Sequence, residues 1–167
     1  TLLKQTQGTI VLGGQVTVEQ RYIAPTIVTN MDWEDALMQE ELFGPILPIL
    51  TYQADQFSNQ VITPIRAREK PLALYLFTND KKIEQIVLQQ LSFGGGVIND
   101  TLLHLSNPHL PFGGVGESGM GHYHGRYSFT TFSHQKAIVK KNRWLPLTML
   151  YAPYTVKKFN LVKRFMK

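Results

Sequence analysis

The sequence predicts an α/β fold built on a layered, mostly parallel sheet. Segments with strand and helix patterns alternate along the chain, which is typical of this class. The run Leu72–Phe77 is continuously apolar, as expected for a strand covered on both faces. The segment Lys81–Leu91 that follows it has apolar residues at helical spacing. With 167 residues and 43% hydrophobic content, the chain is long enough to bury one core.

The first third of the chain has two β-branched segments bounded by glycine or proline, Gly8–Gly14 and Tyr22–Val28. We expect both to be strands. Asp32 can cap a helix that runs to Leu42, and Gly44-Pro45 directly after it would end that helix. A strand is then predicted at Ile46–Leu50.

The middle of the chain predicts a longer alternation. A helix is expected from Ala54 to Arg68, although Pro64 should break or kink it near Thr63, because proline has no N–H to donate. The strand Leu72–Phe77 and the helix Lys81–Leu91 follow, and a short strand is expected at Val97–Asn99.

The last third begins with a glycine-rich loop, Asn107–Gly121. A helix, a strand at Lys136–Lys140 and a loop are predicted after it. The terminal segment Tyr151–Lys167 should end in a short basic amphipathic helix. We find no internal repeat and no low-complexity segment.

The chain contains no cysteine, which excludes disulfides, thiolate zinc sites and a cysteine nucleophile within these residues. It begins at Thr1 without methionine, so we expect a piece of a longer gene product. No apolar run is long enough to span a membrane, and the start has no signal-peptide layout. We therefore expect a soluble, cytoplasmic protein.

Charge divides the chain unevenly. Residues up to Glu117 carry 7 Lys and Arg against 12 acids, whereas the remaining residues carry 10 basic side chains and no acid. Such a tail could bind nucleic acid or an anionic membrane. A solvated or oligomer-facing strand with a lysine-rich edge is the favoured interpretation, because charge runs usually form soluble surface.

Three motifs suggest chemistry that their context does not support. Gly114–Gly119 matches the glycine spacing of dinucleotide-binding turns, but no apolar strand precedes it and no acid follows it. Ser118 lacks the second glycine of a nucleophile elbow and is predicted to be structural. The five histidines lack metal-ligand spacing, so no metal is expected, although His122 and His124 could line a pocket. Residue types alone suggest that Glu40 and Glu41 form a solvated helix end.

Two longer motifs carry a family resemblance. Glu41–Pro45 resembles the Glu-x-Phe-Gly-Pro motif of aldehyde dehydrogenases, and Pro111–Gly121 resembles their Phe-Gly-Gly-x-x-x-Ser-Gly-x-Gly loop. The segments Lys70–Tyr75, Tyr123–Gly125 and Phe129–Lys136 are similar to the class 3 or fatty aldehyde branch. The resemblance covers nearly the whole chain, and it implies NAD or NADP as cofactor and medium-chain, long-chain or aromatic aldehydes as substrates.

The resemblance also implies site residues. Glu41 would hydrogen-bond the nicotinamide ribose, since a carboxylate can accept from both vicinal hydroxyls, and Phe43 would pack beside the nicotinamide ring. Residues implied to shape the aldehyde channel are Asn99, Leu105, Ser106, Phe112 and His124. The family's catalytic cysteine and general-base glutamate lie upstream of these residues, so the chain alone is expected to be inactive.

The same resemblance implies three regions. Residues 1–134 would be the C-terminal part of the catalytic domain, residues 135–145 an oligomerisation strand shared with a second copy in a homodimer, and residues 146–167 a basic tail. Membrane contact is expected only through that tail, and no nucleic-acid partner is expected. The alternative is a dimerisation module or pseudoenzyme without catalytic activity.

Overall fold

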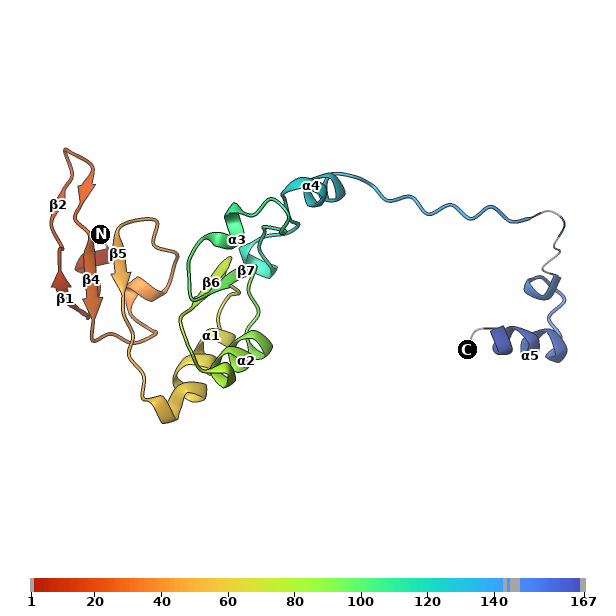
Figure 1. The fold of residues 1–167 in the computed structure, drawn as a ribbon, viewed down its shortest axis with the longest axis horizontal. Helices are drawn as coiled ribbons and strands as arrows, with labels where there is room; N and C mark the ends of the chain where they lie inside the picture. Colours follow the sequence, from red (N-terminus) through yellow and green to blue (C-terminus); the bar gives the residue numbers. More distant parts are fainter. Residues whose placement is uncertain (1, 143, 145–147, 166–167) are drawn as a thin grey trace. The chain divides into compact units, whose positions relative to one another are not determined.

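The computed structural model describes residues 2–142, 144 and 148–165. The chain divides into two compact units, Thr1–Phe132 and Ser133–Lys167. The first unit contains all the strands shown in Figure 1. Residue 1 and parts of the predicted strand and tail (143, 145–147, 166–167) lie outside the described residues.

The first strands form a mixed three-stranded sheet in the order β1-β4-β5 (Figure 1). β1 (Thr9–Leu12) pairs antiparallel with β4 (Thr26–Thr29), which pairs in parallel with β5 (Ile46–Pro48). The prediction of one strand over Tyr22–Val28 is wrong: β3 (Tyr22–Ile23) pairs instead with β2 (Val16–Thr17) in a separate hairpin. Pro25 separates β3 from β4, because its nitrogen cannot donate to a ladder.

The predicted helix from Asp32 to Leu42 is also wrong, since this segment holds only a short 3₁₀ turn, η2 (Ala36–Met38). Asp35 caps η2, and its carboxylate accepts from the Leu37 N–H at 2.9 Å. The same carboxylate accepts from the Gln7 N–H at 2.8 Å and the Thr6 hydroxyl at 2.9 Å. These bonds tie η2 to the start of the chain, near η1 (Leu2–Lys4), and favour a turn over a longer helix.

The predicted helix Ala54–Arg68 forms as three consecutive pieces, η3 (Ala54–Gln56), the π-helical η4 (Ser58–Ile62) and α1 (Thr63–Arg66). Pro64 was expected to break or kink this helix near Thr63; the helical run continues through Pro64, and its type changes from π to α at Thr63. The Thr63 N–H donates five residues back to the Ser58 carbonyl, so the wider π turn makes room for the proline ring.

The second half of the first unit contains a parallel pair, β6 (Ala73–Leu76) and β7 (Gly95–Ile98), joined by α2 (Lys81–Gln90). Asp80 caps α2 through the Lys82 N–H. The predicted strand at Val97–Asn99 begins earlier than expected, at Gly95. These elements enclose a core of Phe57, Ile62, Val87 and Leu91. The prediction of an α/β fold with parallel sheet pieces is confirmed.

The short helix α3 (Leu103–Ser106), absent from the sequence predictions, follows β7. The glycine-rich loop contains η5 (Gly116–Ser118), and an isolated bridge joins Phe112 to Tyr123. The predicted helix after this loop is α4 (Gly125–Thr131).

In the second unit, the predicted basic helix is confirmed as α5 (Val156–Phe165), preceded by η6 (Thr148–Leu150). The predicted strand Lys136–Lys140 is wrong for the single chain, where these residues form no strand. A strand needs a ladder partner, so a sheet shared with a second copy stays a prediction. None of the helices in the described ranges is long and apolar enough to span a membrane.

Candidate functional site

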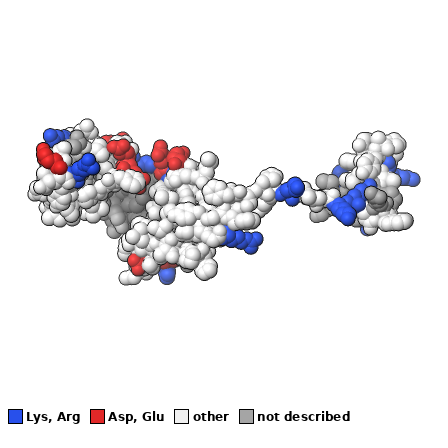
Figure 2. All heavy atoms as spheres, turned by 90° about the horizontal axis from the view of Figure 1, so that it is seen from above, with Lys and Arg blue, Asp and Glu red and all other residues white. Residues whose placement is uncertain are grey.

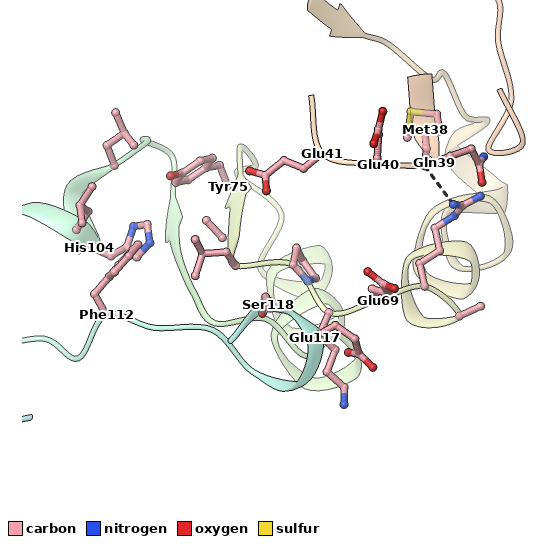
Figure 3. A pocket seen from close by; sticks show the side chains of 18 residues that line it. Met38, Gln39, Glu40, Glu41, Glu69, Tyr75, His104, Phe112, Glu117 and Ser118 are labelled. Carbon is pink, nitrogen blue, oxygen red and sulfur yellow. Dashed lines mark hydrogen bonds between the residues drawn. The ribbon is translucent and has the colours of Figure 1, made fainter. Parts of the chain in front are cut away.

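A cleft of about 1060 Å³ opens within the first unit (Figure 3). One wall is the segment Met38–Glu41, which leads from η2 toward β5. The other wall is formed by residues that follow α1, by β6, by α3 and by the glycine-rich loop. Its lining residues are Ala67, Arg68, Glu69, Lys70, Pro71, Leu72, Ala73, Tyr75, Leu102, His104, Leu105, Phe112, Glu117 and Ser118.

Glu41 extends from the first wall toward Tyr75 on the second (Figure 3). The chain bends directly after it, where the Gly44 N–H donates to the Leu42 carbonyl at 2.9 Å. Among the described residues, no hydrogen bond or ion pair engages the Glu41 carboxylate. Its oxygens are therefore available to accept from hydroxyl groups of a ligand.

The second wall is aromatic. Ring centroids lie 5.9 Å apart for Tyr75 and His104, 5.5 Å for His104 and Phe112, and 5.4 Å for Phe112 and Tyr123. Tyr123 and His124 continue the series at 4.5 Å. The rings of His104 and Phe112 lie side by side in Figure 3. These separations are those of favourable aromatic pairs, so the rings form a preformed aromatic part of the second wall, beside its charged residues Arg68, Glu69, Lys70 and Glu117.

His104 is the least ordinary member of this wall. It is 8% exposed, and neither ring nitrogen has a hydrogen-bond partner among the described residues. Its ring packs against Gly95 of β7, where an added Cβ would lie 2.8 Å from Cδ2 of His104. Leu102, just before α3, has a φ of 61°, which is strained for a side chain of its size. The segment that carries His104 is thus held against the sheet at a conformational cost.

Charge in the cleft is mostly negative. Glu40, Glu41, Glu69 and Glu117 line it together with only two cations, Arg68 and Lys70. Behind the first wall, the bond from the Leu37 N–H lowers the pKa of the Asp35 carboxyl, and bonds from Gln7 and Thr6 act in the same direction against the effect of burial. Asp35 therefore remains ionised and fixes the turn that precedes Glu41.

Three of the predicted site residues meet at this cleft: Glu41, Leu105 and Phe112. Phe112 and Leu105 are far from Glu41 in the sequence. The fold places both of them on the second wall, opposite Glu41 on the first. The roles that the resemblance implies for these three residues stay predictions.

The other four predicted residues do not line the cleft. Phe43 follows Glu41 by two residues, is not among the lining residues and is 94% exposed. The Asn99 side chain bonds both backbone groups of Thr78, and the Ser106 hydroxyl donates to the Leu103 carbonyl at 3.0 Å. The ring centroids of His124 and Phe112 lie 6.2 Å apart, and Nδ1 of His124 lies 3.2 Å from the Leu110 carbonyl oxygen. His122, the other histidine considered for a pocket, is also outside the cleft.

Sequence reasoning missed Tyr75, Leu102, His104 and Arg68. The spacing of Tyr75 within an apolar strand gave no sign that its ring would face a cleft. His104 had been considered only as a metal ligand, and the described residues contain no cluster of three or more metal-ligating groups. Ser118 accepts from the Val115 N–H at 2.9 Å and donates to the Val115 carbonyl at 3.0 Å, in agreement with its predicted structural role.

Comparison with known proteins gives a consistent result. The model of the aldehyde dehydrogenase family matches residues 2–138. The chain is 52% identical to 4,4'-diaponeurosporen-aldehyde dehydrogenase of Staphylococcus aureus, covering 100% of this chain and 36% of the relative. It is 46% identical to aldehyde dehydrogenase family 3 member I1, chloroplastic, of Arabidopsis thaliana, covering 94% of this chain and 28% of the relative.

Two solved structures extend the comparison. The substrate-bound state of Staphylococcus aureus AldH superposes with a TM-score of 0.81 at 53% identity, covering 99% of this chain and 35% of that one. Glyceraldehyde-3-phosphate dehydrogenase GapN of Methanocaldococcus jannaschii, complexed with NADP, gives a TM-score of 0.69 at 29% identity, covering 80% of this chain and 28% of that one. The chain thus spans about a third of the length of its relatives. With its class 3 relatives, this chain belongs to the aldehyde dehydrogenase family.

Proposed function

We propose that this chain forms the C-terminal part of an NAD(P)-dependent aldehyde dehydrogenase that oxidises apolar aldehydes to carboxylic acids. In this reaction the aldehyde and water yield the acid and one proton, and NAD(P)⁺ accepts the hydride. The observation that carries the proposal is the position of Glu41, whose unengaged carboxylate faces an apolar aromatic wall across one cleft.

The residues at the rim suit a nicotinamide ribose. A carboxylate only accepts hydrogen bonds, and a vicinal diol offers two donors, so Glu41 can hold the ribose without a second group. Phe43, two residues later, is 94% exposed and has a ring face free to pack against the nicotinamide. Both contacts would orient the nicotinamide for hydride transfer.

The apolar wall supports medium-chain, long-chain or aromatic aldehydes as substrates. Each methylene buried there contributes about 0.8 kcal/mol to binding. Leu105 and Phe112 supply apolar surface, and the contiguous rings from Tyr75 to Phe112 suit planar substrates. The Staphylococcus aureus relative is named for a diaponeurosporen-aldehyde, which is the kind of substrate that such a wall would accept.

The chain alone should be inactive. The proposed reaction needs a nucleophile, and the sequence has no cysteine. The Ser118 hydroxyl, which lines the cleft, is bonded to the backbone of Val115 and is not placed to act as the nucleophile instead. The catalytic cysteine and the general base would be supplied by a part of the protein outside these 167 residues.

We also propose a homodimer formed through residues 136–141. Ile138 and Val139 are 75% and 93% exposed, and their backbone is extended without a ladder partner in the single chain. An unpaired apolar edge of this kind favours strand pairing with a second copy.

The test is aldehyde-dependent reduction of NAD⁺ and NADP⁺ by the full-length gene product and by the 167-residue chain. We expect activity only in the full-length protein. Glu41→Ala should raise the cofactor KM about tenfold or more, whereas Glu40→Ala, its neighbour on the same wall, should change it less than twofold. Activity in the cysteine-free chain, or an unaltered cofactor KM in Glu41→Ala, would refute the corresponding part of the proposal.

A further inference from the structure

One side chain joins the two walls of the cleft. Among the described residues of the first unit, every side-chain hydrogen bond between residues 2–50 and residues 54–132 is donated by Arg68. Arg68 follows α1 and lies on the second wall, and its side chain is 29% exposed. The position of Glu41 relative to the aromatic wall therefore depends on what Arg68 binds.

Arg68 makes four contacts with the turn that carries the first wall. Its guanidinium donates to the carbonyl of Trp33 and, at 3.3 Å, to the carbonyl of Met38, the bond drawn as a dashed line in Figure 3. It also lies 3.3 Å from the Glu34 carboxylate and 5.2 Å from the centroid of the Trp33 ring. A planar fork of donors suits two carbonyls and a ring at once, which a lysine ammonium does not.

The turn that Arg68 holds is internally rigid. The Gln39 amide donates to the carbonyls of Trp33 and Asp35, at 3.0 and 3.1 Å, and Asp35 caps η2. Leu37, in the middle of the turn, is 1% exposed. The turn should therefore move as one rigid body. Glu41 lies only three residues after Met38, whose carbonyl Arg68 binds, so Glu41 should move with the turn.

We propose that Arg68 is a positioning residue for Glu41. By fastening the turn 33–39 to the end of α1, it sets how far the Glu41 carboxylate stands from the aromatic wall, and hence whether the carboxylate meets a bound ribose. The inference rests on the proposed function of Glu41. Arg68 itself does not contact the cofactor in this account, and its effect on binding passes through Glu41.

The test uses the full-length protein and cofactor binding by steady-state kinetics. Arg68→Ala should raise the cofactor KM about tenfold and leave the aldehyde KM within twofold. Arg68→Lys should recover only a small part of the loss, because one ammonium cannot serve both carbonyls. Arg66→Ala is the matched control: this arginine on α1 is exposed and its side chain makes no hydrogen bond with the described residues, so its removal should have less than a twofold effect.

A double-substitution cycle separates this inference from the proposed function. If Arg68 acts through Glu41, Arg68→Ala should add less than twofold to the cofactor KM of Glu41→Ala; an additive, roughly hundredfold total would overturn the positioning role. A normal KM in Arg68→Ala beside a raised KM in Glu41→Ala would also overturn it. An unaltered KM in Glu41→Ala would refute the proposed ribose contact instead, and the positioning role with it.

Hydrogen exchange gives a readout that does not depend on activity. Amides of residues 33–41 should exchange faster in Arg68→Ala, while those of α2 should be unchanged. Glu34→Gln, which removes only the ion pair with an 85% exposed carboxylate, should leave exchange of the turn nearly unaltered. Unchanged exchange of residues 33–41 in Arg68→Ala would show that Arg68 does not hold the turn.

Discussion

The two units of the chain differ in what holds them together. The first unit closes on itself around a buried core and keeps acids and bases on its surface. None of the described residues of the second unit belongs to the buried core, and after Glu117 the chain carries 10 basic side chains and no acid. Figure 2 shows only basic charge on the second unit. The first unit is specified by its own packing, whereas the described residues of the second unit are mostly exposed in the single chain.

Matched isoleucines give the largest expected contrast. Ile62→Ala removes a side chain that is 1% exposed in the core and should lower the free energy of unfolding by about 2–5 kcal/mol. Ile138→Ala, at a site 75% exposed, should change it by less than about 0.5 kcal/mol in the isolated chain. Urea denaturation measures both. Equal losses would show that the two units do not differ in packing.

A glycine pair tests how tightly the aromatic wall is packed. Gly95→Ala should lower the free energy of unfolding by about 1–3 kcal/mol, because the new Cβ would lie 2.8 Å from the His104 ring and that ring would have to move. Gly44→Ala meets no atom within 4 Å and should be neutral or slightly stabilising. Thermal unfolding distinguishes them, and a neutral Gly95→Ala would mean that the wall can yield.

The contribution of the Asp35 carboxylate to the stability of the first unit should depend on pH. Hydrogen bonds from the Leu37 N–H, and then from Gln7 and Thr6, keep the pKa of Asp35 below its usual value. Its contribution to stability is therefore complete above about pH 4, the pKa of an unfolded aspartate, and is lost as pH falls through the lower folded pKa.

Asp35→Asn should thus destabilise the chain at pH 7, and the difference from the wild type should shrink as the solution is acidified below pH 4. Denaturation at a series of pH values checks this, with Asp55→Asn, on the exposed η3, as the control. A difference that stays constant down to the acid limit would contradict the folded pKa direction.

The smallest effect is expected in α5. Lys158→Met removes the hydrogen bond from Lys158 Nζ to the Tyr151 carbonyl, 2.9 Å long. Lys157→Met removes an exposed lysine whose side chain makes no hydrogen bond with the described residues. Both substitutions relieve positive charge near the helix start, so the difference between them isolates the bond, at about 0.5 kcal/mol. NMR Cα shifts of residues 156–164 report helix population, which should be lower in Lys158→Met.

Local patterns predicted most of the first unit. The apolar run predicted the strand β6 and the helical spacing predicted α2. The expectation that this strand is covered on both faces is wrong for the single chain, where no residue of β6 is buried and Phe77 is 66% exposed. The helix expected from Asp32 failed because Asp35 binds residues almost thirty positions earlier, which no local window reveals. Pro64 was expected to break or kink a helix, but a π turn absorbed it.

The site residues that the family resemblance names could be predicted from the sequence. Residues that reach the cleft only through tertiary contacts could not. Glu41, Leu105 and Phe112 were named from motif resemblance and meet at the cleft. Tyr75 ends a segment that resembles the family, and Arg68 lies in no quoted motif; the resemblance assigned neither of them to the site, and only the fold places them at the cleft. Asn99 and Ser106 were assigned to a channel, yet their polar groups bond neighbouring backbone, a choice that sequence spacing does not determine.

Asn99 shows how a side chain can stand in for a peptide group. The β6–β7 ladder ends where the Asn99 N–H donates to the Leu76 carbonyl at 2.7 Å, and the backbone then turns left-handed. Beyond that point the Asn99 amide accepts from the Thr78 N–H at 2.8 Å and donates to the Thr78 carbonyl at 3.0 Å. The two hydrogen bonds of the Asn99 side chain therefore extend the β6–β7 pairing by one residue, beyond the point where the main chain turns toward α3. A primary amide suits this position because its short side chain carries both a donor and an acceptor.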